Sequence, residues 1–268
     1  MPLSNIQATI LQTIAKNRSL ESYVAGASVI HAAPRTPRFS HDVDIFHDDQ
    51  NAVAKSAVAD EQALRQAGFS VEWREQFPTF FRAVVRCDKE VVEIDWAADS
   101  AYRFFPLEPD PLFGFKLHPL DVATNKVLAF VGRCEIRDLV DCLHLHKTVL
   151  SLGALIWAAC GKDEGYTPER ILNEAQRRAH FRASELSQLD LVRKPDPVRL
   201  RTAWDVAITK ARRLAESLPA EELGCLYIDP TGKAVTPNPK RGFTRLVRHR
   251  GTYRGILPVI HSLPTDSK

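Results

Sequence analysis

The chain has 268 residues, of which 26% are charged and 44% are hydrophobic, and its formal net charge is +3. At roughly 150 residues per domain, this length accommodates one large domain or two small ones. The composition excludes a collagen, a disulfide-held mini-protein and a disordered chain. No apolar stretch reaches the ~18–20 residues that span a bilayer, and residues 1–16 lack the pattern of a signal peptide. We therefore expect a cytoplasmic protein with no membrane partner.

The charge is distributed unevenly along the chain. Residues 1–150 carry 16 Lys and Arg against 20 Asp and Glu, whereas the remaining 20 basic and 13 acidic residues give residues 151–268 a balance of +7. The most basic segment contains no acid; its cations are Lys240, Arg241, Arg245, Arg248, Arg250 and Arg254. Such a stripe is compatible both with a contact to a phosphate backbone and with an ordinary solvated surface.

The front of the chain alternates helical and extended patterns. Ser4 precedes apolar residues at helical spacing, and a short strand at residues 23–25 ends at a glycine. Further strands are expected at 41–46 and 69–74, and residues 80–87 and 90–96 form the clearest hairpin pattern. Helices are expected at 29–33, with Pro34 as its stop, and at 51–67, 119–131 and 136–147.

The back of the chain is mostly helical in pattern. Thr167-Pro168 and Asp196-Pro197 each combine a cap residue with proline at the first helical position. Residues 226–228 then indicate a strand, and a turn sequence follows. The chain is thus predicted to be an α+β protein, with a mixed β-sheet and flanking helices in residues 1–150. Residues 151–268 form a mostly helical C-terminal region with a short β-hairpin and the basic tail.

Two carboxylates stand out in the strand at residues 41–46. Asp42 and Asp44 project from the same face of that strand, because side chains alternate with a period of two. Close carboxylates repel each other unless a cation lies between them, and Mg²⁺ prefers oxygen ligands while keeping positions for waters and substrate phosphates. The alternative is an exposed acidic pair with no ligand. Asp95, or Glu93 with the same parity, could supply a third carboxylate for two metal ions.

A glycine turn precedes this acidic strand. Gly26, Ala27 and Ser28 lead from a strand into a short helix, where backbone N–H groups can bind a phosphate. The Ser28 side chain adds a hydroxyl, and Arg38 adds a positive charge that suits a triphosphate.

A second group of charged residues lies in two predicted helices. Asp138 and Asp141 are three residues apart and share a helix face. Lys126, on the preceding helix, could contact a phosphate oxygen or pair with Asp138. The structural alternative is a salt-bridge cluster that holds the two helices together.

Together these motifs resemble the nucleotidyltransferases of the DNA polymerase β superfamily, and more narrowly the AbiEii/AbiGii-type toxin nucleotidyltransferases. Gly26, the pair Asp42 and Asp44, and the later Asp95 match the superfamily. The narrower family's Arg-x-Ser, D-x-x-x-[NA]-K and R-D-x-x-D segments match residues 38–40, 121–126 and 137–141. The resemblance covers residues 20–150. Ala27 departs from the usual Gly or Ser of the turn.

The resemblance implies transfer of a nucleoside monophosphate from an NTP to an acceptor, with Mg²⁺, and two such ions, as cofactor. The expected catalytic residues are Asp42, Asp44, Lys126 and Asp138, and the expected metal ligands are Asp42, Asp44 and Asp95. The residues expected to bind the nucleotide are Gly26, Ala27, Ser28, Arg38, Ser40 and Asp141. The resemblance further implies tRNA as acceptor, bound through the basic C-terminal region, and a cognate antitoxin as partner.

Two alternatives remain open at this stage. The first is a non-catalytic member of the fold that binds RNA or protein, which the alanine at position 27 would favour. The second is a nucleotidyltransferase that acts on a small molecule of the antibiotic type, for which the basic tail would be incidental.

Overall fold

The computed structural model describes residues 3–32, 36–133 and 135–260, together with the backbone but not the side chain of Arg241. The predicted helix stop at Pro34 and the cysteine at position 134 lie outside the described residues. The chain divides into two compact units. The first comprises Met1–Ala101, Pro106–Val122 and Leu189–Lys194, and the second comprises Tyr102–Phe105, Ala123–Gln188 and Pro195–Lys268. The sequence-based boundary at residue 150 follows the motifs, whereas this division follows compactness and groups residues 136–148 with the second unit.

The first unit is built on a seven-stranded mixed sheet with strand order β3-β4-β5-β2-β1-β8-β7. The pairings β1–β2, β3–β4, β4–β5 and β7–β8 are antiparallel, whereas β2–β5 and β1–β8 are parallel. The strands are β1 (Ser22–Ala25), β2 (Asp42–His47), β3 (Ser70–Phe77), β4 (Phe80–Cys87), β5 (Glu90–Ala98), β7 (Glu108–Asp110) and β8 (Gly114–Lys116). The predicted mixed sheet is confirmed.

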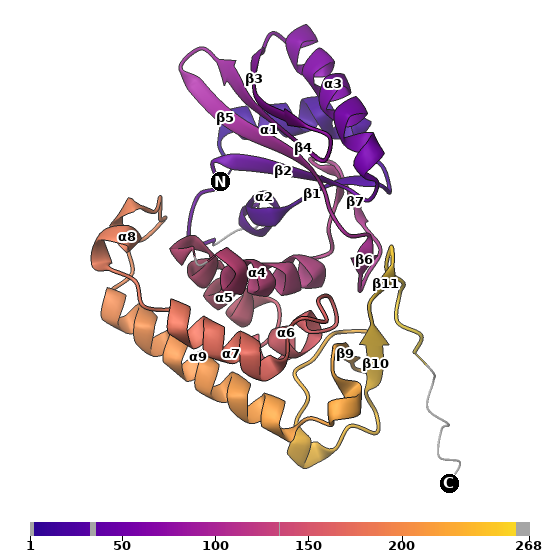
Figure 1. Ribbon diagram of the computed structural model, residues 1–268, viewed down its shortest axis with the longest axis vertical. Helices are drawn as coiled ribbons and strands as arrows, with labels where there is room; N and C mark the ends of the chain where they lie inside the picture. Colours follow the sequence, from indigo (N-terminus) through magenta and orange to yellow (C-terminus); the bar gives the residue numbers. More distant parts are fainter. Residues whose placement is uncertain (1–2, 33–35, 134, 261–268) are drawn as a thin grey trace. The chain divides into compact units, whose positions relative to one another are not determined.

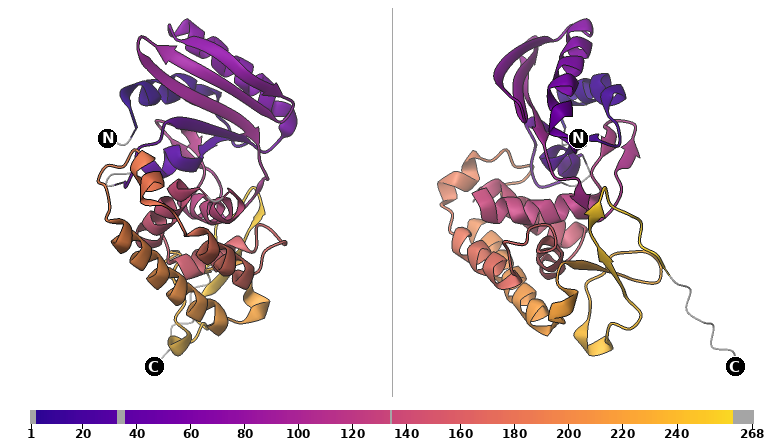
Figure 2. Two further views of the ribbon diagram at one scale, coloured as in Figure 1. Left: turned by 60° about the vertical axis from the view of Figure 1, so that its left-hand side comes forward. Right: turned by 45° about the vertical axis from the view of Figure 1, so that its right-hand side comes forward.

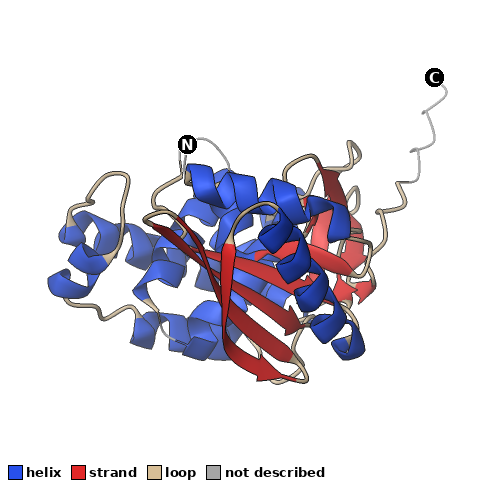
Figure 3. Cartoon of the chain, turned by 90° about the horizontal axis from the view of Figure 1, so that it is seen from above, coloured by secondary structure: helices blue, strands red, loops and turns tan. Residues whose placement is uncertain are grey.

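Helices cover the apolar face of this sheet (Figures 1 and 3). They are α1 (Asn5–Ile14), followed by a 3₁₀ turn (Ala15–Asn17), and α3 (Gln50–Gln66). Ser4 caps α1 through a reciprocal capping box with Gln7, as its position before the apolar pattern predicts. The core between helices and sheet includes Val43 and Ile45 of β2 and Ile94 and Trp96 of β5, which are fully buried. The alternate residues of these strands therefore project from the other face.

The hairpin between β4 and β5 confirms the register that its sequence predicts. Cys87 pairs with Glu90, so Asp88 and Lys89 form a two-residue turn. Asp88 has a φ of 52°, in the left-handed region that such turns require. The register then places Arg82 opposite Asp95. The helix α2 (Gly26–His31) begins three residues earlier than the sequence predicts, directly at the glycine that ends β1.

The second unit is mainly helical, as predicted, and contains two short strand pairs (Figure 2). Its helices are α4 (Pro119–Arg133), whose first turn belongs to the first unit, then α5 (Ile136–Thr148), α6 (Leu152–Ala159), α7 (Pro168–Arg178), α8 (Ala183–Gln188) and α9 (Pro197–Ser217). Short 3₁₀ turns span Ala220–Glu222 and Pro239–Arg241. The strands are β6 (Tyr102–Arg103), β9 (Cys225–Ile228), β10 (Val247–Arg250) and β11 (Thr252–Tyr253).

Close packing of small residues joins the elements of the second unit. A β-carbon on Gly153 of α6 would lie 2.9 Å from the Ala211 Cα of α9, so the two helices approach at these positions. A β-carbon on Gly161 would lie 2.4 Å from the Gly224 carbonyl oxygen, which fixes the end of α6 against the start of β9. The antiparallel pair β9–β10 confirms the predicted C-terminal hairpin, with Cys225 opposite Arg250.

Two cations of the basic tail are committed to this packing. Arg248 forms an ion pair with Glu222 at 2.7 Å and donates to the carbonyls of Phe243 and Leu246. Arg250 donates to the carbonyls of Leu223 and Glu221. Both guanidinium groups therefore stabilise the β9–β10 region, so the tail is not a uniformly free basic stripe.

Within the described residues, no single helix has the length and apolar character needed to cross a membrane. The consecutive helices α5 and α6 are long and apolar enough only when taken together, and the chain bends by 110° between them. The described cysteines at positions 87, 142, 160 and 225 are free thiols, of which Cys87 alone is exposed.

Candidate functional site

The first unit presents the predicted acidic pair on the face of β2 opposite the core. Val43 and Ile45 are fully buried, whereas the alternating Asp42 and Asp44 are half-buried. In the parallel pairing with β5, Asp42 lies beside Glu93 and Asp44 lies beside Asp95. The register therefore gathers four acidic residues on one face across two neighbouring strands.

Gly26 lies directly against this acidic face. Its φ is 68°, a conformation that L side chains rarely adopt. A β-carbon at this position would lie 2.2 Å from the Asp44 Oδ2 atom and 3.0 Å from its Cγ atom. The glycine is therefore required for two reasons, because it supplies the turn and because it leaves room for the carboxylate. Ala27, the next residue, is buried.

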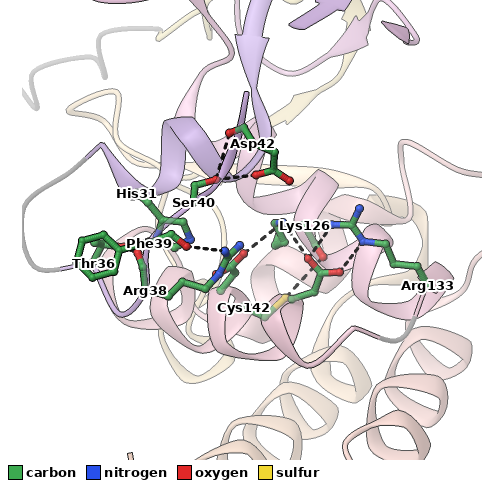
Figure 4. Close-up of polar contacts among 11 residues, drawn as sticks. His31, Thr36, Arg38, Phe39, Ser40, Asp42, Lys126, Arg133 and Cys142 are labelled. Carbon is green, nitrogen blue, oxygen red and sulfur yellow. Dashed lines mark hydrogen bonds and ion pairs between the residues drawn. The ribbon is translucent and has the colours of Figure 1, made fainter. Parts of the chain in front are cut away.

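Two serines position Asp42. The Ser40 hydroxyl donates to the Asp42 Oδ1 atom at 2.8 Å and so orients the carboxylate (Figure 4). The Ser28 hydroxyl is fully buried and donates to the Asp42 carbonyl at 2.7 Å, which ties α2 to β2. The Gln7 side-chain amide in turn donates to the Ser40 carbonyl at 2.8 Å. The cap of α1 is therefore connected to the acidic pair through Gln7 and Ser40, a role for Gln7 that the motifs do not reveal.

Arg38 belongs to a segment that is held by backbone contacts. Its Nη1 atom donates to the neighbouring Phe39 carbonyl at 3.0 Å, and its backbone forms an isolated bridge with Leu191. The Phe39 amide donates to the Asp190 carbonyl at 2.9 Å. Arg38 is buried, so its guanidinium is held in place shortly before the start of β2.

Asp95 has a strong partner on the adjacent strand. Both of its carboxylate oxygens accept hydrogen bonds from Arg82, each at 2.7 Å. These bonds, more than the attraction of Asp95, Glu93 and Glu75, raise the pKa of Arg82. The sequence contains the signal for this pair, because a two-residue turn at Asp88 and Lys89 sets the hairpin register. In this arrangement the guanidinium already balances the charge of Asp95.

The carboxylates of the acidic face differ in their suitability for a metal ion. Asp42 and Asp44 offer oxygen donors on one strand face, a set that fits Mg²⁺, which commonly binds one or two carboxylates together with substrate phosphates. The two oxygens of Asp95 are directed to Arg82 instead. Over residues 3–32, 36–133 and 135–260, no three His, Cys, Asp or Glu side chains gather closely enough to hold a metal by themselves. A two-carboxylate site that is completed by substrate matches these observations.

The second unit contains the other predicted cluster, which joins α4 to α5 (Figure 4). The Lys126 Nζ atom lies 2.9 Å from the Asp138 Oδ1 atom and 3.3 Å from the Asp141 Oδ2 atom. Arg133 holds Asp138 in a bidentate pair, at 2.7 Å to Oδ2 and 2.9 Å to Oδ1. Cys142 is buried beside the Lys126 carbonyl. The structure therefore brings together all three residues that the sequence assigns to this cluster.

Ion pairing outweighs burial in this cluster. Burial alone would lower the pKa of Lys126, but the carboxylates of Asp141 and Asp138 raise it. Burial would likewise raise the pKa of Asp138, but Arg133 and Lys126 lower it. Lys126 is therefore a charged ammonium at neutral pH. It can neutralise a phosphate oxygen but cannot act as a base.

Comparison with solved structures defines the fold of the chain. The structure is similar to JHP933 from Helicobacter pylori, with a TM-score of 0.51 and 17% identity over 80% of this chain and 95% of that one. It is also similar to MenT4, a nucleotidyltransferase toxin from Mycobacterium tuberculosis, with a TM-score of 0.56 and 16% identity over 81% of this chain and 83% of that one. The nucleotidyltransferase-like fold that the sequence predicts is therefore confirmed.

A family comparison matches the N-terminal part of the chain. Residues 5–101 match the family described as a nucleotidyl transferase of unknown function. The matched segment includes Gly26, Asp42, Asp44 and Asp95 and ends where the first segment of the first unit ends. No curated protein matches the chain significantly. The match over residues 5–101 supports nucleotidyl transfer, as the motifs predict.

Proposed function

We propose that this protein transfers a nucleoside monophosphate from an NTP to an acceptor in a Mg²⁺-dependent reaction. The observation that carries the proposal is the pairing of Asp42 and Asp44 on one strand face with Gly26 against the second carboxylate. In the reaction, an acceptor hydroxyl attacks the α-phosphorus and the bond to the leaving pyrophosphate breaks. The hydroxyl proton passes to water.

The residues of the acidic face have separate tasks in this proposal. Asp42 and Asp44 would hold Mg²⁺, which supplies charge neutralisation at the phosphates when bound. Ser40 orients the Asp42 carboxylate through its hydrogen bond, and Gly26 keeps the Asp44 carboxylate in position. Backbone groups of Gly26, Ala27 and Ser28, together with Arg38, would bind the nucleotide. Asp95, paired with Arg82, is assigned a supporting electrostatic role rather than a direct bond to the metal.

We propose Lys126, in the second unit, as a further catalytic residue, as its motif implies. Its charged ammonium is already attracted by two carboxylates, so Asp138 and Asp141 fix its direction. Electrostatic stabilisation of phosphoryl oxygens by a preorganised cation is a large term in such reactions. Asp138 and Asp141 would thus act by positioning Lys126.

We propose tRNA as the acceptor and a toxin role with a cognate antitoxin. The positive balance of residues 151–268 supports an RNA acceptor, since phosphate contacts dominate such binding. The fold similarity to MenT4, which is described as a nucleotidyltransferase toxin, supports the toxin role.

The test is incubation of the purified chain with Mg²⁺, total tRNA and each α-labelled NTP in turn. Asp42→Asn should reduce label transfer more than 100-fold, beyond the roughly 10–100-fold loss typical of groups that only orient a metal ligand. Its melting temperature should stay within a few degrees of the parent, because Asp42 lies outside the core. Glu90→Gln, at the exposed start of β5, removes a carboxylate of the same sheet and is the matched control.

Each outcome distinguishes one assignment. Label on tRNA that disappears in Asp42→Asn but persists in Glu90→Gln supports the reaction, the acceptor and the role of Asp42. Label on the protein, or on an added aminoglycoside, would show that this molecule is the acceptor in place of tRNA. Salt-sensitive RNA binding without transfer from any NTP would contradict the enzyme and favour a binding protein.

A further inference from the structure

A hollow of about 520 Å³ lies within the second unit, and no residue of the Lys126 cluster lines it. It is formed by α9, the start of α6, the loop before β10 and His146 near the end of α5. Its size falls in the range of pockets that bind small ligands or the anchoring side chains of a partner. None of the residues assigned to catalysis, metal binding or nucleotide binding lines it.

The floor of the hollow is apolar. Gly153 of α6 contacts α9 so closely that Ala207, Ala211 and Leu214 form a continuous surface beside it. Ala207 and Ala211 are buried, and Leu214 is half-buried. An apolar side chain that entered here would lose contact with water on a surface that is already fixed by helix packing.

The walls are held in place by hydrogen bonds. The Thr236 hydroxyl donates to the Ser151 hydroxyl at 2.7 Å, which joins the loop to the cap of α6. Asn238 caps the 3₁₀ turn that carries Lys240. The His146 Nδ1 atom accepts from the Leu152 amide at 2.9 Å, which leaves Nε2 as the ring donor at neutral pH. The hollow is therefore a preformed feature with a polar edge.

The rim carries three cations, namely Lys210, Arg213 and Lys240. All three are exposed, and over the described part of the chain no carboxylate or carbonyl oxygen pairs with their side chains. No carboxylate lies among the described residues that line the hollow. Burial, followed by Lys210 and Lys147, lowers the pKa of His146, which is a further sign of positive potential here.

Several other cations of the same unit have acidic or amide partners. Arg177 and Arg178 both pair with Glu174, and Arg248 pairs with Glu222. Arg212, next to Arg213 on α9, donates to the Asn173 side chain. In contrast to these, Lys210, Arg213 and Lys240 surround an apolar floor, where they would meet an anionic partner.

We propose that this hollow docks an acidic segment of a partner protein, with one aliphatic side chain inserted on the Gly153–Leu214 floor and carboxylates paired with Lys210, Arg213 and Lys240. Charge complementarity identifies the occupant as acidic, and the apolar floor requires an anchoring side chain. No Phe, Tyr or Trp is among the described lining residues, so the stacking platforms that bind nucleobases are missing here. The inference stands apart from the transfer reaction.

The test measures binding of a fluorescent peptide of glutamates around one central leucine to the full chain. The double variant Lys210→Glu/Arg213→Glu should weaken binding about tenfold or more, because like charges then face each other. Arg177→Glu/Arg199→Glu makes the same charge change on exposed helix positions outside the hollow and should leave affinity within about twofold. Chemical shifts of the Leu214 methyl groups should move on binding and report its location.

Several results would overturn the proposal. They are binding that persists in Lys210→Glu/Arg213→Glu, equal losses in both double variants, and unchanged Leu214 methyl shifts. A peptide with serine in place of leucine, or with lysines in place of glutamates, should bind at least about tenfold more weakly, and equal binding would contradict the anchor or the charge. Displacement by octanoate at equal concentration, or by a short RNA, would assign the hollow to a small amphipathic anion or to nucleic acid instead.

Discussion

Two buried ion-pair clusters, one in each compact unit, show how differently the same chemistry can be used. Arg18 and Asp60 of the first unit lie 2.5 Å apart with both side chains fully enclosed. Asp60 also accepts hydrogen bonds from Asn17 at 2.8 Å and Trp96 at 2.7 Å, so its oxygens are saturated by the core. In the second unit, Lys126 is shared between two carboxylates, and the Arg133 side chain that completes the cluster is 49% exposed.

The balance of burial and pairing separates the two clusters. For Arg18 and Asp60, burial dominates, so the pKa of the arginine is lowered and that of the aspartate is raised. For Lys126 and Asp138, pairing dominates, and both pKa values move toward the charged forms. The Arg18–Asp60 pair, here called the closed pair, therefore keeps its charges buried against an unfavourable desolvation free energy, which suits a structural role. The cluster of Lys126, Asp138, Asp141 and Arg133, here called the open cluster, keeps the Lys126 ammonium charged, which suits binding of an anion.

The largest expected effect is on stability, in the closed pair. Asp60→Ala should lower the free energy of unfolding by about 3–5 kcal/mol, because it leaves Arg18 buried without a counter-charge. Urea unfolding followed by circular dichroism measures this loss. The double variant Arg18→Met/Asp60→Leu should recover much of it, since neither charge then remains buried. A loss below about 1 kcal/mol in Asp60→Ala would show that the pair is not a closed structural element.

The next effect is on activity, in the open cluster. Lys126→Met should reduce kcat about 10²–10³-fold, as expected for the loss of one preorganised group that stabilises transition-state charge. The loss of unfolding free energy should be smaller for Lys126→Met than for Asp60→Ala, because Asp138 keeps its bidentate partner Arg133. Label-transfer kinetics and urea unfolding of the same preparations measure both. Lys147→Met, at an exposed position of α5, is the control, and full activity in Lys126→Met would make the cluster purely structural.

The smallest effect is a pH dependence in the first unit. His47 is buried beside the closed pair, and burial, followed by Arg18, lowers its pKa to about 4. The unfolded chain takes up this proton near pH 6.5, so stability is fully present above that pH and falls as the pH drops toward 4. The full loss is about 3 kcal/mol. His47→Gln should flatten the curve of unfolding free energy between pH 6.5 and 4.5, and parallel curves for the two proteins would contradict this origin.

The parts of the fold that were predictable are those with local signals. The alternation in β2 predicted both its buried face and the common face of Asp42 and Asp44. Ser4, Thr167 and Asp196 marked helix starts, because each supplies a cap to the first turn. The strands β7 and β8 were missed, since three residues carry no periodicity. Their turn depends instead on Asp110, which accepts from the Leu112 and Phe113 amides and pairs with Lys116.

The candidate site likewise contains features that local sequence signals predict and features that depend on contacts between distant residues. The positions of Gly26, Asp42 and Asp44 followed from strand period and turn chemistry. Helix spacing predicted the common face of Asp138 and Asp141 but left open whether Lys126 pairs with Asp138. The pairing of Arg82 with Asp95 depends on hairpin register, and the roles of Arg248 and Arg250 depend on contacts with distant carbonyls. Composition alone counted these last two arginines as part of a basic surface, whereas the fold uses them internally.

The contact between Gly26 and Asp44 has a consequence for comparing sequences. Because the carboxylate occupies the space of a β-carbon, any other amino acid at position 26 must displace Asp44 even when every acidic residue is retained. A homologue with both aspartates but without this glycine would therefore be expected to be a pseudoenzyme. Under the proposed function, the residue at position 26 is thus a criterion for activity that an inventory of acidic motifs would overlook.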